Sequence, residues 1–192
     1  MREFLDRVQA AVGDDGRLPL GAMTEWDVFP FEREGLRARA LTDYANPEPE
    51  RRKAPADCKT CAALDRADLV LHGGERLAVI RPGGCNLPFV ANIVSRAHEP
   101  LDDLDDDGHV ELGRLIGRTY AALRALEGIG NVHVSKWENG TGHLSVTLLA
   151  RPLGVLQLRG SNLAAWADML PPTPAEELDA RAAKVRAALA AR

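Results

Sequence analysis

The chain has 192 residues, of which 45% are hydrophobic and 27% charged, and its formal net charge is −4 at pH 7. This length and apolar content suit one packed domain with an extension. The negative charge argues against a protein that mainly neutralises phosphate backbones, so no nucleic-acid partner is expected. No apolar stretch approaches the roughly 18 residues that span a membrane, no secretion signal is seen, and three cysteines make no disulfide framework. These features favour a cytoplasmic protein without a membrane partner.

The first part of the chain, residues 1–54, is expected to be an extension of the main domain. Apolar side chains at helical spacing predict a short helix over residues 1–12. Residues 17–45 mix aromatics, prolines and charge, which indicates irregular or edge structure. Residues 46–57 form a linker rich in Pro, Arg and Glu that leads into the first two cysteines.

The main domain, residues 55–192, reads as an α+β unit. A long helix with an apolar stripe follows the acidic run at residues 102–107. A last helix is expected to begin with Thr173 as its N-cap and Glu176 completing a capping box. Short apolar runs predict five strands, at residues 69–71, 77–80, 89–95, 132–137 and 143–149. We therefore expect an antiparallel sheet of about five strands, with the long helix packed on it and a C-terminal helix.

Four potential metal ligands lie in the middle of the chain. Alone, Cys58-Lys59-Thr60-Cys61 could be two small buried cysteines on a turn. Two histidines change this interpretation, because His98 ends one predicted strand and His143 opens another. Two thiolates and two imidazoles suit a tetrahedral Zn²⁺ ion, and four protein ligands leave no open position, so we expect a structural zinc. Cys85 lies outside this spacing and is expected to be a loop residue.

The last two strands are expected to pair as a hairpin around the Asn139-Gly140 turn signal. If the turn centres on Gly140, Ser135 pairs with Ser145 and His133 with Thr147. Residues two apart in a strand share a face, so these side chains would line one polar face. A His133–Ser145 pair could then act on an ester or a phosphate. The alternative is a polar face that binds a ligand, or nothing.

The segment His143-Leu144-Ser145-Val146-Thr147-Leu148-Leu149 resembles the signature of the histidine triad (HIT) superfamily of nucleotide hydrolases and transferases, in which three histidines alternate with apolar residues. The following Ala150-Arg151-Pro152 and the upstream segment from Phe89 to His98 fit the same pattern. The resemblance covers roughly residues 55–192. It implies the HIT-like α+β fold and a homodimer with the long helix at its interface.

Zinc-bearing members of this family hold the metal with a Cys-x-x-Cys, the histidine of the upstream turn and the first histidine of the triad. The resemblance places these roles on Cys58, Cys61, His98 and His143. The zinc half of the family pattern is therefore complete in this chain.

The catalytic half of the pattern is degenerate and reads His-x-Ser-x-Thr. The family's nucleophile, the middle histidine, is replaced by Ser145, and the third histidine is replaced by Thr147. The phosphate-binding loop before the triad is reduced to Asn139-Gly140-Thr141-Gly142. Arg81-Pro82 stands near the position where the family often has an acidic residue that holds the ribose. The candidate ligand contacts are Asn139, Thr141, Ser145 and Thr147.

Three functions remain open on this basis. The first is a zinc-containing HIT-like protein that binds a nucleotide or another phosphate ester without the family's covalent chemistry. The second is a diverged hydrolase or nucleotidyl transferase that uses Ser145, His133 or a metal-activated water. The third is a non-catalytic interaction module in which the zinc only holds the fold.

Overall fold

A computed structural model describes residues 10–26, 29–38, 47–137 and 140–191. The chain divides into two compact units, Met1–Pro49 and Glu50–Arg192. From the sequence, the boundary was expected after residue 54. Residues 50–54 belong to the second unit because, among other contacts, the amide of Lys53 donates to the carbonyl of Thr141 at 3.1 Å. The helix expected over residues 1–12 lies largely outside the described residues, and the first unit includes a short 3-10 helix, η1 (Gly21–Glu25).

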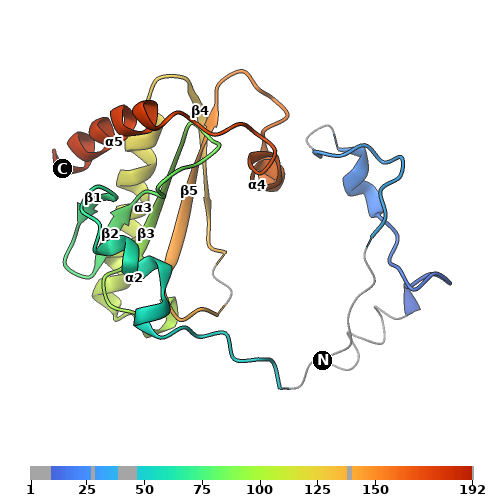
Figure 1. The fold of residues 1–192 in the computed structure, drawn as a ribbon, viewed down its shortest axis with the longest axis horizontal. Coiled ribbons are helices and arrows are strands. Elements are labelled where there is room, and N and C mark those ends of the chain that lie inside the picture. The colour runs from blue at the N-terminus through green and yellow to red at the C-terminus, as the bar shows by residue number, and fades with distance from the viewer. Residues whose placement is uncertain (1–9, 27–28, 39–46, 138–139, 192) are drawn as a thin grey trace. The chain divides into compact units, whose positions relative to one another are not determined.

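The second unit is built on a five-stranded antiparallel sheet with the order β1-β2-β3-β5-β4. The strands are β1 (Val70–Gly73), β2 (Leu77–Ile80), β3 (Phe89–Ser95), β4 (Ile129–Ser135) and β5 (Ser145–Pro152). In Figure 1 the last strand, β5, runs between β3 and β4. The expected α+β architecture is confirmed, and β5 occupies an interior position of the sheet.

The first face of the sheet carries the main core under two helices, α3 (Asp106–Arg124) and α5 (Ala175–Ala190). Asp105 caps α3, since its carboxylate accepts a hydrogen bond from the amide of Gly108 at 2.6 Å. Alternate residues of β3 and β5, such as Ile93 and Val146, point into this core. Burial of each such side chain contributes about 1.5–3 kcal/mol, so this face fixes which residues of β5 point the other way.

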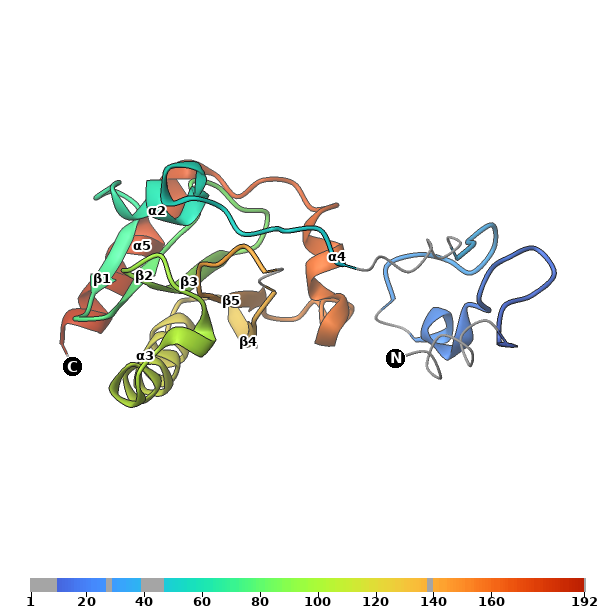
Figure 2. The same ribbon diagram turned by 90° about the horizontal axis from the view of Figure 1, so that it is seen from below.

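The second face of the sheet is covered at two separate places. The helix α2 (Lys59–Leu64) packs through Ala63 and Leu64 on the small cluster of Ala78, Ile80 and Val94. Figure 2 shows α2 and α3 on opposite sides of the sheet. The helix α4 (Leu163–Ala167), which the sequence analysis did not predict, packs with the segment around it over Val90 and Leu149. The stretch of sheet between α2 and α4 is where the polar side chains of β5 lie.

The start of α5 differs from the expected capping box. Pro174 is the N-cap, and no side-chain capping hydrogen bond is formed. The hydroxyl of Thr173 donates instead to the carbonyl of Leu87 at 2.7 Å, which ties the chain before α5 to the loop before β3. The Thr173 hydroxyl therefore makes a tertiary contact in place of the helix cap that the sequence pattern predicted.

In the described part of the chain, no helix is both long enough and apolar enough to cross a membrane.

Candidate metal centre and ligand-binding face

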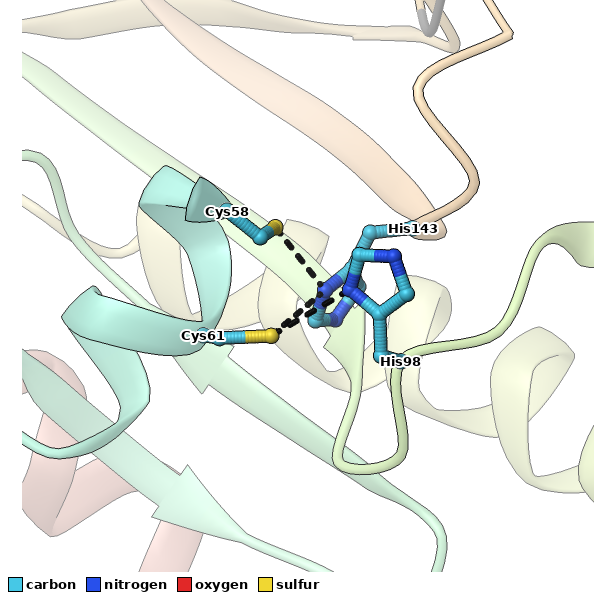
Figure 3. A group of neighbouring side chains, drawn as sticks. All are labelled: Cys58, Cys61, His98 and His143. Carbon is cyan, nitrogen blue, oxygen red and sulfur yellow. Dashed lines mark hydrogen bonds between the residues drawn. The ribbon is translucent and has the colours of Figure 1, made fainter. Parts of the chain in front are cut away.

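The four predicted metal ligands converge on one point in the second unit (Figure 3). Cys58 is the N-cap of α2 and Cys61 lies in its first turn, so one short helix presents both thiols to the same side. His98 comes from the turn after β3, and His143 lies two residues before β5. One nitrogen or sulfur atom from each of the four residues lies within 4.8 Å of the others.

The distances within this cluster fit a tetrahedral metal site. The Sγ atom of Cys61 lies 3.3 Å from Nδ1 of His98 and 3.4 Å from Nδ1 of His143. The Sγ atom of Cys58 lies 3.3 Å from the same Nδ1 of His143. Metal bonds of about 2.3 Å to sulfur and about 2.0–2.1 Å to nitrogen place sulfur and nitrogen about 3.5 Å apart in a tetrahedron. The donor set is therefore arranged as a metal site with four protein ligands.

The second ring nitrogen of His143 is also held. Nε2 lies 2.8 Å from the carbonyl oxygen of Ser95, the last residue of β3. A carbonyl oxygen only accepts, so Nε2 carries the proton and Nδ1 presents its lone pair to the two thiols, as in most histidines that bind a metal. The turn that carries His98 is fixed to the same place, because the carbonyl of Glu99 accepts from the Ser95 hydroxyl and from the amide of Leu144.

Burial affects the protonation of the thiols in this cluster. His143 is only 2% exposed, and Cys58 is buried as well. Burial, followed by the hydrogen bond with the Cys58 thiol, raises the pKa of the Cys61 thiol. Only thiolates bind metals, so a bound divalent cation reverses this effect and its binding releases protons.

Four half-buried polar side chains occupy the second face of the sheet between α2 and α4, and we call them the polar strip: Asn92, Ser135, Ser145 and Thr147. The strand register places Thr147 between Asn92 of β3 and Ser135 of β4. The Thr147 hydroxyl donates to Oδ1 of Asn92 at 2.8 Å. Ser145 lies two residues after the metal ligand His143, so the metal site fixes the start of β5, the middle strand of the polar strip.

Several solved structures share this architecture, although no family model matches the sequence and no curated protein matches it significantly. A zinc-bound histidine triad family protein from Mycobacterium smegmatis superposes with a TM-score of 0.53 at 16% identity, over 72% of this chain and 96% of that one. A hypothetical histidine triad nucleotide-binding protein from Sulfolobus tokodaii gives 0.51 at 14% identity, over 70% and 93%. The chain has the histidine triad fold. A uridylyltransferase structure also matches, with a TM-score of 0.50 at 19% identity, over 71% of this chain and 47% of that one.

Within this histidine triad fold, the predicted His133–Ser145 pair is not formed. Ser135 lies opposite Thr147 and His133 opposite Leu149, two residues away from the expected register. Leu149 lies four residues along β5 from Ser145, which is about 13 Å in a strand. The expected turn was too tight, because β4 ends at Ser135 and β5 begins only at Ser145. A shift of two residues preserves the face, so the prediction of a polar face still holds.

His133 lies at one end of this face, next to a cavity of about 210 Å³ that Ser135 and Ser161 also line. Its Nε2 is buried and has no hydrogen-bond partner among the described residues. Burial, and then the nearby charge of Arg151, lowers the pKa of His133. The lowered pKa favours the neutral form of the ring. The neighbouring Val134 lies opposite Leu148, on the other face of the sheet, and is exposed.

The other residues predicted to contact a ligand do not join the polar strip in the described part of the chain. Asn139 lies outside the described residues, and Thr141 contributes its backbone carbonyl to the bond with Lys53. Arg81, which stands near the family's ribose position, turns away from the polar strip. Its guanidinium lies 2.6 Å from Oδ1 of Asp179 on α5, and its side chain is only 10% exposed. Arg81 is thus part of the contact between the sheet and α5.

Two residues of this face were not predicted from the sequence. Asn92 is the polar residue within the apolar run of β3, and this break in the pattern was the available signal. Trp137 was assigned to a hairpin strand, whereas it follows the end of β4 and is 49% exposed beside the cavity of His133. An exposed tryptophan next to a polar strip is a typical feature of a ligand-binding surface.

Proposed function

We propose that this chain binds a nucleotide or another small phosphate ester on the second face of its sheet, without the histidine-nucleophile chemistry of its fold. The observation that carries this proposal is the polar strip, which lies between α2 and α4 and crosses β3, β5 and β4. The metal ligand His143 precedes its middle strand, β5, by two residues. Hydroxyl and amide groups on a partly exposed face suit the oxygen atoms of a phosphate ester.

We further propose that the metal is Zn²⁺ and that its role is structural. Two thiolates with two imidazoles are a soft, tetrahedral donor set, which zinc prefers. Four protein ligands leave no position for a reactive water. A zinc-bound protein of the same fold supports this assignment. Metal analysis of the purified protein should find about one zinc per chain.

The residues at positions 145 and 147 support the proposal of a function without covalent chemistry. A serine hydroxyl is a weak nucleophile unless a base lies within hydrogen-bond reach. The nearest histidine that the sequence offered as a base, His133, lies opposite Leu149 and not beside Ser145. We therefore expect binding without turnover of adenosine phosphoramidate or of dinucleoside polyphosphates. Turnover that Ser145→Ala abolishes would instead establish an enzyme.

The binding proposal is tested by calorimetric titration with AMP. We expect one site per chain, and we expect Thr147→Val to weaken binding about tenfold, because a hydrogen bond to a charged group contributes about 1.5–3 kcal/mol. Thr24→Val, in the first unit, serves as the matched control and should bind like the parent. No binding of AMP or of ribose 5-phosphate would contradict the proposed function.

We propose in addition that the protein is a homodimer through α3. Val110 is exposed on this helix, and Gly113 and Gly117 are four residues apart. A Cβ atom added at either glycine would meet nothing within 4 Å among the described residues. Glycines at this spacing permit the close approach of another helix, and a second copy of α3 is the partner that the fold suggests.

A further inference from the structure

The second unit has a groove beside α4 that continues the polar strip, and we infer that it binds a planar nitrogen-containing aromatic ring, namely the base of the proposed nucleotide. This inference rests on the proposed function and adds the position and the orientation of the ligand. The helix that builds the groove, α4, was not expected from the family resemblance. The specificity-determining residue of the site is Trp137.

The groove consists of two cavities that share a wall. The larger has a volume of about 350 Å³, within the range of ligand pockets. The smaller, of about 210 Å³, is the cavity next to His133. Trp137, Leu149 and Ala164 line both cavities. The two cavities are therefore direct neighbours, and we call them together the α4 groove.

The walls of the α4 groove suit a flat ring. Val90 and Leu149 form an apolar floor on the sheet, and Ala164 of α4 is too small to fill the space above them. Trp137 stands at the shared wall with half of its surface exposed. Stacking of a base on an aromatic side chain contributes about 1–3 kcal/mol, and every base has a face that can stack.

Polar groups at both ends of the α4 groove favour a base over a hydrocarbon ring. Asp168 lines the larger cavity and offers acceptor oxygens for an amino group. Ser161 and His133 line the smaller one. The hydroxyl of Ser161 can both donate and accept, so it can pair with a ring nitrogen or with an amino group.

The position of the groove also orients the ligand. Ser135 belongs both to the smaller cavity and to the polar strip, where it lies opposite Thr147. Ser145 lies further along β5, toward the metal centre. A base in the α4 groove therefore directs its ribose and phosphate over the polar strip, with the phosphate at the end nearest His143.

The test compares adenosine, AMP and ribose 5-phosphate as probes in calorimetric titrations of the full chain. We expect Trp137→Ala to weaken adenosine and AMP binding about tenfold and to leave ribose 5-phosphate unchanged. Ala164→Leu adds bulk to the wall that the two cavities share. It should likewise weaken adenosine and AMP binding and leave ribose 5-phosphate binding unchanged. The matched control is Trp26→Ala, since Trp26 is 51% exposed in the first unit and Trp137 is 49% exposed.

The outcomes separate this inference from the proposed function. If AMP and ribose 5-phosphate bind equally well, or if both groove variants bind AMP like the parent, the base does not occupy the α4 groove and the inference is overturned, while the proposed function stands. If adenosine binds and loses affinity in both variants but ribose 5-phosphate does not bind, the groove is supported and the phosphate site is overturned. If no probe binds, both proposals are overturned.

Discussion

The imidazole of His143 donates a hydrogen bond of 2.8 Å from Nε2 to the carbonyl oxygen of Ser95, at the end of β3. The opposite nitrogen of the same ring faces the thiols of Cys58 and Cys61. One side chain thus links the sheet to α2 and sets the start of β5. The metal centre is consequently expected to matter for the position of the polar strip as well as for stability.

Loss of one thiol ligand should destabilise the protein strongly. We expect Cys58→Ser to remove the bound zinc and to lower the melting temperature by at least about 10 °C, because a structural zinc contributes several kcal/mol and 1 kcal/mol corresponds to about 2–4 °C in a domain of this size. Metal content and calorimetric melting are the measurements. Cys85→Ser is the matched control, since Cys85 lies outside the cluster. Equal melting temperatures in the two variants, with zinc loss confirmed, would contradict a structural metal.

The stability of the protein should depend on pH through His133. The folded state lowers the pKa of this imidazole, chiefly by burial and then through the charge of Arg151. Below about pH 6.5 the unfolded chain therefore binds more protons than the folded one, and the free energy of unfolding decreases as the pH falls. We expect His133→Gln to lose less stability than the parent between pH 7.5 and 5.5, measured by urea unfolding. Parallel pH dependences of the two proteins would show that His133 titrates normally.

The contact between Arg81 and Asp179 should contribute more to the free energy of unfolding than an exposed ion pair does. Removal of the carboxylate in Asp179→Ala leaves the nearly buried guanidinium without this partner, and we expect a loss of about 1–3 kcal/mol in urea unfolding. The matched control is Asp68→Ala, since Asp68 and its partner Arg66 are both exposed and such pairs contribute about 0–1 kcal/mol. AMP binding should be unchanged in Asp179→Ala, because Arg81 faces α5. If Asp179→Ala lost AMP binding but kept its stability, Arg81 would instead belong to the ligand-binding site.

The dimer proposal predicts an oligomeric state that depends on α3. Sedimentation equilibrium of the parent should give twice the mass of the chain, and Gly117→Leu should give a monomer. The variant is expected to remain folded, because replacing an exposed helical glycine gains up to about 1 kcal/mol in helix propensity. Ala180→Leu, at an exposed position of α5, is the control and should stay dimeric. A parent of monomeric mass would exclude this dimer.

Most of the fold could be predicted because its signals are local. Apolar runs located the strands within a few residues, and the acidic run marked the start of α3. The ligand set of the metal site was also predictable, since thiol and imidazole groups at these spacings have few other uses. By contrast, the register of β4 and β5 depends on the long connection between Ser135 and Ser145, whose path no dipeptide signal specifies.

The ligand-binding face was less predictable than the metal site. The floor of the α4 groove depends on which strands become neighbours, and its wall comes from a helix of five residues that has no strong sequence signal. Thr173 shows the same limit, because a tertiary partner took the hydroxyl that local rules assigned to a helix cap. The role of a residue cannot be predicted from local sequence patterns when it depends on contacts with distant segments.

The metal centre brings together three segments that are far apart in the chain, since Cys61 and His98 are 37 residues apart and Cys58 and His143 are 85 apart. Closing such long loops has an entropic cost that a cross-link offsets. A zinc ion at this site would act as a reversible cross-link, whose presence depends on the zinc available to the cell. The concentration of protein with an assembled polar strip would then follow zinc supply, even at a constant rate of synthesis.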